Sequence, residues 1–199
     1  MWLNVGMNIG DNMYRNVLSG MTLTFIAFGA LTLCSPPAPA KEAQAHMLHD
    51  VNNEVGCLAD NIYWESRNQS VKGMMAVAMV TRNRVLDTRF PHTYCEVVHE
   101  GPTRPSWKDP TKYHPVKNRC QFSWYCDGKA ENVPAADADL FKFMHALAFK
   151  IYHGNLLDIT YGATHYHADY VKPAWAESKT RTIKVGNHIF YRWERNTSK

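Results

Sequence analysis

The 199-residue sequence lacks internal repeats, low-complexity stretches and any concentrated block of one charge. Its hydrophobic share of 45% and charged share of 20% exclude a disordered or fibrous protein. The net charge of only +4 is scattered along the chain, which argues against nucleic acid as a partner. This small positive excess is compatible with weak attraction of the protein to an anionic surface. It is also compatible with a solvated protein surface that binds no charged partner. The length favours a single domain.

Charged residues are also missing from an apolar run at 17–33, which follows Arg15 and precedes a stretch of small residues ending at Ala40. This order is typical of a secretory signal peptide cleaved after Ala40, with Ala45 as a second candidate end. The run reaches the lower limit for spanning a bilayer, so an N-terminal membrane anchor is the alternative. We therefore expect export, with membrane association of the N-terminus if the segment is retained.

The rest of the chain divides by composition into three parts. We expect a polar linker at 41–53, one continuous domain at 54–193 and a polar tail at 194–199.

Cysteine is scarce, with five in the sequence. Cleavage of the signal peptide after Ala40 would remove one of them, Cys34. The four that remain are Cys57, Cys95, Cys120 and Cys126. An even number in an oxidising compartment predicts two disulfides, for which three pairings are possible. A metal site that includes His114 is the alternative for the last two cysteines, although their spacing lacks the C-x-x-C pattern of zinc sites.

Periodicity predicts helices in the first part of the domain and strands in the last. Apolar residues recur at helical spacing in 55–66, 70–87 and 136–153, and a short helix is expected at 93–99. Asp50, Asn52 and Asn53 are candidate caps of the first helix, Ser70 caps the second, and Gly154 ends the third. Four prolines predict an irregular loop at 100–116. Strands are expected at 159–168 and 182–193, with a turn at Gly186 and Asn187. The fold class is α+β.

Glu65 is the candidate catalytic residue. It lies seven positions after Leu58 and three after Ile62, so it projects from the apolar face of its helix. It also lies in the last turn, where the helix dipole disfavours a negative charge. Both effects predict a raised pKa, which is what a proton donor to a glycosidic oxygen requires. The alternative is a structural ion pair with Arg67 or Arg82.

Seven segments resemble the SleB-type cell-wall hydrolase family, which includes spore-cortex-lytic transglycosylases. In chain order they are CLADNIYWESRN at 57–68, GMMAVAMVTRNRV at 73–85, YCEVV at 94–98, CQFSW at 120–124, GATHYHA at 162–168, PAW at 173–175 and VGNHIF at 185–190. Together they cover about residues 54–193. Each segment alone is weak evidence for this family, but the seven segments together are specific to it.

The resemblance implies a lysozyme-like fold, helical first with a small antiparallel sheet last, and Glu65 as the catalytic acid. It implies that the glycan cleft is lined by Gln121, Phe122, Tyr166, His167 and Trp175. It also implies cleavage of peptidoglycan between N-acetylmuramic acid and N-acetylglucosamine by a lytic transglycosylase. We expect a monomer that uses no cofactor or metal. The enzyme would act in the periplasm, cell envelope or extracellular space, or in a host envelope if a phage encodes it.

Three alternatives stay open at this point. A hydrolytic muramidase would need a second carboxylate, for which Asp127, Asp158 and Asp169 are candidates. A zinc-dependent wall amidase would use His165, His167 and His188 as ligands. The third is a wall-binding module without catalysis.

Overall fold

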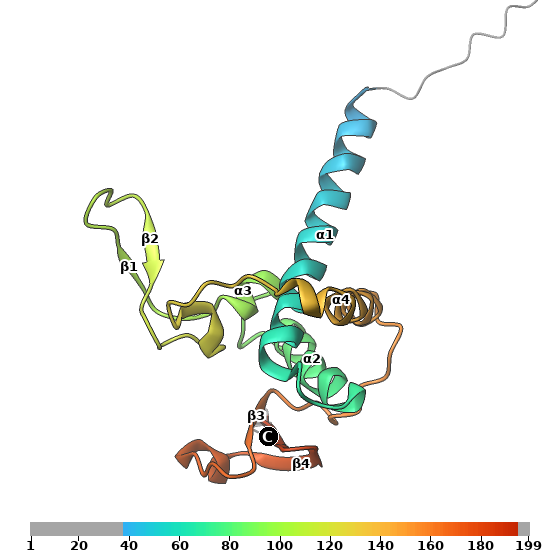
Figure 1. Cartoon of the computed structure of the whole chain (residues 1–199), viewed down its shortest axis with the longest axis vertical. Coiled ribbons are helices and arrows are strands. Elements are labelled where there is room, and N and C mark those ends of the chain that lie inside the picture. The colour runs from blue at the N-terminus through green and yellow to red at the C-terminus, as the bar shows by residue number, and fades with distance from the viewer. Residues whose placement is uncertain (1–37, 195–199) are drawn as a thin grey trace, which may run out of the picture. The chain divides into compact units, whose positions relative to one another are not determined.

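A computed structural model describes residues 38–194, in which helices come first and a three-stranded sheet comes last (Figure 1). The expected signal or anchor segment before residue 38, including Cys34, lies outside the described residues. So does the tail after Glu194. Within 38–194, no helix has the length and apolar character needed to cross a membrane.

The first helix, α1, runs over Ala38–Ser66 and is longer than we predicted. It passes through 41–53, so this range is helical rather than an irregular linker, and Asp50, Asn52 and Asn53 do not cap its start. The physical reason is composition, since Ala, Glu, Lys, Gln, Met and Leu dominate 41–48 and all favour helix. The first half of α1 extends beyond the other helices (Figure 1).

The remaining helices follow their local signals. They are α2 at Val71–Val85, α3 at Tyr94–Val98 and α4 at Ala138–Tyr152. Ser70 caps α2 by accepting a hydrogen bond from the N–H of Gly73 at 3.3 Å, as predicted. Gly154 ends α4 with φ +72° and donates its N–H to the carbonyl of Ile151 at 3.0 Å.

The main core lies between α1, α2 and α4. The apolar faces of these helices contribute the buried side chains Val55, Leu58, Ile62, Met74, Met79, Met144, Leu147 and Ile151. The apolar faces predicted for the helices at 55–66 and 136–153 are confirmed. Val71, although apolar and within the predicted helix 70–87, is 56% exposed because it is the first residue of α2.

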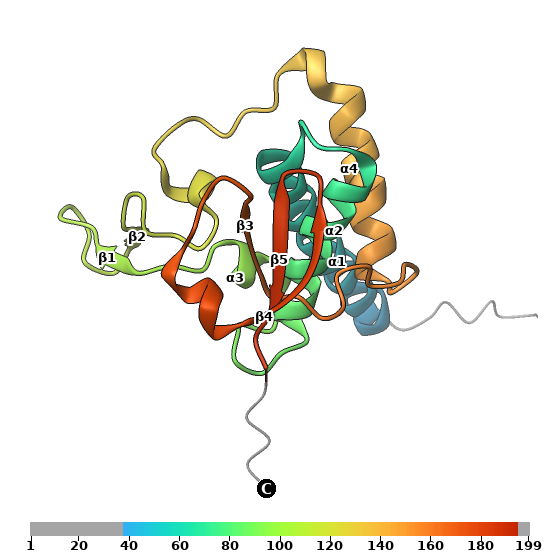
Figure 2. The same cartoon turned by 90° about the horizontal axis from the view of Figure 1, so that it is seen from below.

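The sheet consists of β3 at His165–Ala168, β4 at Thr180–Val185 and β5 at His188–Arg192, in the order β3-β5-β4. All pairings are antiparallel, and the predicted turn at Gly186 and Asn187 joins β4 to β5. One face packs on α2 through Phe190 and Val185 (Figure 2). The α+β class is confirmed. Residues 159–164 precede β3 instead of belonging to it.

The proline-rich range 100–116 contains a short hairpin, so the prediction of an irregular loop is wrong in part. Strand β1 at Thr103–Pro105 pairs antiparallel with β2 at Tyr113–Pro115. Pro105 and Pro115 occupy the last position of each strand, where the missing N–H disturbs a two-stranded ladder least.

The four cysteines within the described residues form two disulfides. Cys57 joins Cys95 and ties α1 to α3, while Cys120 joins Cys126 within one loop. This selects one of the three possible pairings. The sulfur atoms of Cys120 and Cys126 bond to each other, so the alternative of a metal site with His114 is wrong.

Candidate active site

Glu65 lies in the last turn of α1, and its half-buried carboxyl group accepts a hydrogen bond from the hydroxyl of Tyr166 at 2.7 Å. Tyr166 comes from β3, so the contact joins the helical part of the domain to the sheet. Burial raises the pKa of Glu65 above the usual glutamate value. The hydrogen bond from Tyr166 and the positive charge of Arg84 partly oppose that rise. The predicted direction is confirmed.

The predicted alternative of an ion pair between Glu65 and Arg67 or Arg82 is wrong. Within the described range 38–194, none of the ion pairs involves Glu65. Arg67 is exposed, and its guanidinium lies 5.1 Å from the ring centroid of Tyr63 and 5.2 Å from that of Trp64. The cation near Glu65 is instead the buried Arg84.

Arg84 projects from the end of α2 and is only 5% exposed. Its Nε donates to the carbonyl of Thr164 at 2.8 Å, and its guanidinium lies between the rings of Phe90 and Phe122, at 5.3 and 5.2 Å. The sequence did not lead us to expect this residue to be buried beside Glu65. The available signal was helical spacing, because Arg84 follows the buried Val80 by four positions.

Glu100 is a further charged group that sequence reasoning missed. It follows α3, and its Oε2 atom is buried without a hydrogen-bond partner. The Nη1 atom of Arg84 is likewise buried and unpartnered, and the negative charge of Glu100 acts on Arg84. The charge of a buried cation, Arg84, therefore interacts with two carboxyl groups, those of Glu65 and Glu100.

A pocket of about 380 Å³ opens at Glu65. Its lining residues are Trp64, Glu65, Arg67, Ser123, Trp124, Asp127, Lys129, Ala130 and Glu131. The indole rings of Trp64 and Trp124 stack with centroids 6.2 Å apart. The site thus combines a partly buried acid, flat apolar rings and polar groups of both signs, as a saccharide site needs.

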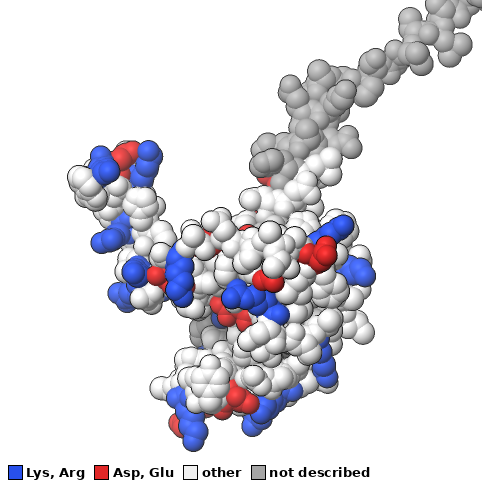
Figure 3. Space-filling view, viewed as in Figure 1, with Lys and Arg blue, Asp and Glu red and all other residues white. Residues whose placement is uncertain are grey.

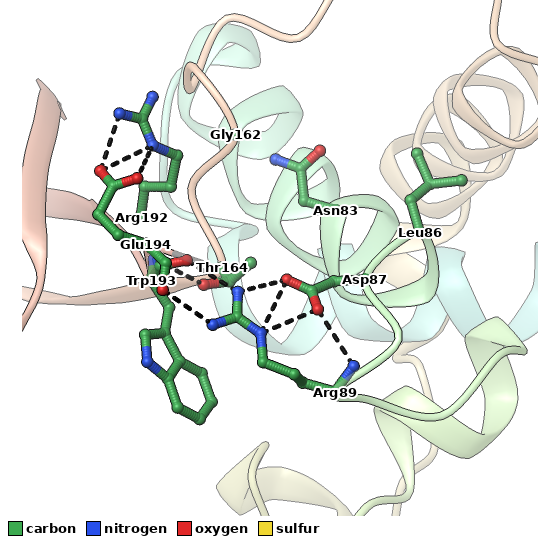
Figure 4. A pocket seen from close by; sticks show the side chains of 9 residues that line it. All are labelled: Asn83, Leu86, Asp87, Arg89, Gly162, Thr164, Arg192, Trp193 and Glu194. Carbon is green, nitrogen blue, oxygen red and sulfur yellow. Dashed lines mark hydrogen bonds and ion pairs between the residues drawn. The ribbon is translucent and has the colours of Figure 1, made fainter. Parts of the chain in front are cut away.

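Figure 4 shows a different pocket, of about 470 Å³, at the ends of α2 and β5. Its charged groups bind one another. Arg89 donates to both carboxylate oxygens of Asp87 and to the carbonyls of Trp193 and Glu194, and Arg192 pairs with Glu194 at 2.8 Å. Glu65 does not line this pocket, so we place the candidate chemistry in the smaller one.

The residues predicted to line the cleft fall into two groups. Tyr166 contacts Glu65, and the buried Phe122 packs near Arg84. Gln121 is exposed beside Phe122, and its backbone N–H donates to the carbonyl of Glu100 at 2.9 Å.

His167 and Trp175 are not gathered around Glu65. Side chains alternate along a strand, so His167 points to the face of the sheet opposite to that of Tyr166. There its ring lies 5.6 Å from that of Trp175 and stacks on Tyr191 at 5.2 Å. These two positions form an aromatic surface behind β3, separate from the pocket at Glu65.

The three histidines considered as zinc ligands also lie on different faces. His165 and His167 share the outer face, while His188 lies beside Tyr166 on the inner face, with ring centroids 5.1 Å apart. Burial and the nearby cations lower the pKa of His165 to about 3. In the part of the chain that the structure describes, no three His, Cys, Asp or Glu side chains are grouped as metal ligands would be.

Of the three candidate second carboxylates, only Asp127 lines the pocket of Glu65. Asp158 accepts hydrogen bonds from the side chain of Asn83 and from the backbone of Thr160 and Gly162, which indicates a structural role. Asp169 pairs with Lys184 at 2.8 Å. Glu131, which we had not predicted, joins Asp127 in the pocket lining.

Comparison with known proteins gives consistent matches. A family model described as Cell Wall Hydrolase matches residues 68–191, a range that begins shortly after Glu65. Two solved structures are similar at 26% identity and a TM-score of 0.50, each over 70% of this chain. One is the catalytic domain of the Bacillus cereus SleB protein, and the match covers 90% of that chain. The other is the catalytic domain of the germination-specific lytic transglycosylase SleB from Bacillus anthracis, and the match covers 94% of that chain. No curated protein matches the chain.

Proposed function

The chain belongs to the cell wall hydrolase family, and from this premise we propose that it cuts the glycan strands of peptidoglycan with Glu65 as its catalytic acid. One observation carries the assignment of the residue. The Glu65 carboxyl group is half-buried, held by the Tyr166 hydroxyl at 2.7 Å, and open to a pocket lined by two tryptophans. One of the similar structures is a lytic transglycosylase by its description, and we propose the same reaction here.

The proposed reaction has two steps and uses one carboxyl group. In the first, Glu65 gives its proton to the oxygen that links C1 of N-acetylmuramic acid to N-acetylglucosamine, and the C1–O bond breaks. In the second, the Glu65 carboxylate takes the proton of the C6 hydroxyl of the muramic acid, and O6 bonds to C1. The product is a 1,6-anhydro ring, Glu65 is protonated again, and no water is consumed.

The surroundings of Glu65 suit both steps. Burial favours the neutral acid that the first step needs near neutral pH. The Tyr166 hydroxyl and the Arg84 charge stabilise the carboxylate that exists between the steps. A group that acts first as acid and then as base benefits from surroundings that stabilise each of its two forms.

A hydrolytic muramidase is the second candidate, because Asp127 and Glu131 line the same pocket as Glu65. Either carboxylate would activate a water molecule or bond to C1 in place of O6. The product would then carry a reducing end.

The test of the assignment is the substitution Glu65→Gln in the full chain. We expect cleavage of purified peptidoglycan to fall by roughly 10²- to 10⁴-fold, because glutamine cannot donate the proton. Glu177→Gln, an exposed position on another segment, is the matched control and should cut normally. A Glu65→Gln enzyme that cuts at the normal rate would contradict the proposal.

Mass spectrometry of the released fragments separates the candidate reactions. Anhydro-muramic ends support transglycosylation. Reducing ends would support hydrolysis, and Asp127→Asn would then be the next variant. Freed stem peptides would support an amidase instead.

We also propose that the protein acts in the cell envelope after export, as the substrate requires. The two disulfides support this, since such bonds persist in oxidising compartments. N-terminal sequencing of the protein recovered from the envelope distinguishes a signal peptide cleaved after Ala40 from a retained anchor, and light scattering tests the predicted monomer.

A further inference from the structure

The hairpin β1–β2 and its two stems form a projecting arm, residues 101–117. Figures 1 and 2 both show the arm standing away from the helices and the sheet. Its tip is ordered by local hydrogen bonds, because the N–H of Ser106 donates to the carbonyl of Lys112 at 2.7 Å and Asp109 accepts from Thr111. Trp107 lies at this tip and is 88% exposed. An aromatic side chain this exposed contributes little to folding.

The arm carries most of the net charge of the chain. Its cations, all exposed, are Arg104, Lys108, Lys112 and Lys117. Its one carboxylate, Asp109, pairs with Lys112 at 3.3 Å. The net charge of the arm is therefore +3, against +4 for all 199 residues. Figure 3 shows the cations along the arm.

The base of the arm is fixed by several contacts. The N–H of Val116 donates to the carbonyl of Pro102 at 2.9 Å, and the disulfide Cys120–Cys126 follows directly. The first stem approaches the loop after the arm so closely that a Cβ atom on Gly101 would lie 3.0 Å from the Cα of Cys120. These contacts hold the arm in one place relative to the loop that follows it.

That loop also lines the candidate active site. Ser123, Trp124, Asp127 and Lys129 come immediately after the arm, and all four border the pocket at Glu65. The arm is thus attached through the chain to one wall of the pocket.

We propose that the arm is a second binding site for peptidoglycan outside the pocket, an inference that rests on the proposed function. The cations match the repeated carboxylates of the stem peptides, and the exposed face of Trp107 can pack on a sugar ring. Lys108 lies 5.1 Å from the centre of the Trp107 ring, so cation and aromatic surface are presented together. A contact away from the cleft raises the local concentration of a polymeric substrate at Glu65.

An anionic membrane is the competing partner, and the observations favour it less. Binding at a lipid interface needs a broad apolar face. The arm exposes two separate aromatic rings, Trp107 at its tip and Tyr113 on β2, and its cations are spread from Arg104 through the tip to Lys117. It therefore lacks a broad apolar face.

The test measures binding without cutting, in full-length protein that carries Glu65→Gln. The arm variant Trp107→Ala/Lys108→Gln/Lys112→Gln is compared with Phe143→Ala/Lys142→Gln/Lys150→Gln on the exposed side of α4. Both variants lose one exposed aromatic ring and two lysines. We expect sedimentation with purified peptidoglycan sacculi to show a Kd about tenfold weaker for the arm variant and nearly unchanged for the control. Added salt should weaken binding more in the parent than in the arm variant.

Equal binding of sacculi by the arm variant and the control would overturn the inference. Normal binding of sacculi with weaker binding of phosphatidylglycerol vesicles would also overturn it and assign the arm to membranes. Circular dichroism of each variant verifies folding. A protein with Glu65 intact that binds sacculi through the arm but releases no fragments would overturn the proposed function and leave the arm assignment standing.

Discussion

At the scale of single residues, the protonation of Glu65 depends on groups from separate elements. The charged or titratable side chains that act on it are Tyr166 of β3, Arg84 of α2 and, through Arg84, Glu100 after α3. Arg67, Asp127, Lys129 and Glu131 border the same pocket. Burial favours the neutral acid, and the two direct partners favour the carboxylate. Substitution of either direct partner, Tyr166 or Arg84, should therefore shift the pKa of Glu65 and with it the pH range in which the acid is protonated.

Replacing Tyr166 with phenylalanine tests this balance. The hydroxyl lowers the pKa of Glu65, so its loss should raise that pKa further. The alkaline limb of the pH–rate profile, where Glu65 loses its proton, should move to higher pH, and kcat/KM should fall about tenfold because a hydrogen bond to a charged group is lost.

Tyr161→Phe is the matched control, because Tyr161 is 63% exposed and does not contact Glu65. Its profile should equal that of the unmodified enzyme. If the alkaline limb stays in place in Tyr166→Phe, Tyr166 does not position or tune the acid.

At the scale of secondary structure, local signals predicted the elements whose ends they mark. Ser70 and Gly154 are capping residues in the sequence, and α2 begins and α4 ends there. The start of α1 was missed because the polar residues 41–53 lack apolar periodicity, although their propensity for helix is high. The hairpin was missed because proline content suggested a loop, whereas the register places Pro105 and Pro115 at strand ends.

Two kinds of sequence signal predicted the site, helical spacing for Glu65 and the family resemblance for Tyr166. Spacing from Leu58 and Ile62 placed Glu65 on the buried side of its helix, and the raised pKa followed. It could not show that Tyr166, rather than its neighbours His165 and His167, faces Glu65. That choice depends on how β3 packs against the helices, which is a property of tertiary structure. Tertiary packing also buries the unpartnered side-chain atoms of Arg84 and Glu100, so helical spacing could not predict them either.

The two disulfides should differ in their contribution to stability. Loop-closure entropy gives about 4 kcal/mol for Cys57–Cys95, which closes 38 residues, and about 2 kcal/mol for Cys120–Cys126, which closes six. The double variant Cys57→Ala/Cys95→Ala should therefore unfold at lower urea concentration than Cys120→Ala/Cys126→Ala. Each pair serves as the other's control. If Cys120→Ala/Cys126→Ala unfolds at the lower urea concentration instead, the prediction is wrong. In that case noncovalent contacts hold α1 and α3 together without the disulfide.

At the scale of the whole molecule, the buried carboxyl group of Glu65 makes stability depend on pH. A carboxyl group whose pKa is raised by folding favours the folded state below its unfolded pKa, and that contribution is lost as pH rises through the folded value. The Glu65→Gln variant has no such loss. Its free energy of unfolding, measured relative to the unmodified protein, should therefore increase between pH 4 and pH 8.

Urea titrations at several pH values measure this difference. Glu177→Gln, at an exposed position, should give a difference that does not change with pH. A constant difference for Glu65→Gln as well would mean that Glu65 titrates in the folded protein as it does in the unfolded chain.

The hydrogen bond between Tyr166 and Glu65 joins residues 101 positions apart. In a nascent or unfolded chain, Glu65 is an ordinary glutamate, ionised at neutral pH and unable to donate a proton. In the proposed mechanism, the capacity to cut is therefore acquired only when folding buries Glu65 and raises its pKa. A chain that has not yet folded should leave peptidoglycan intact.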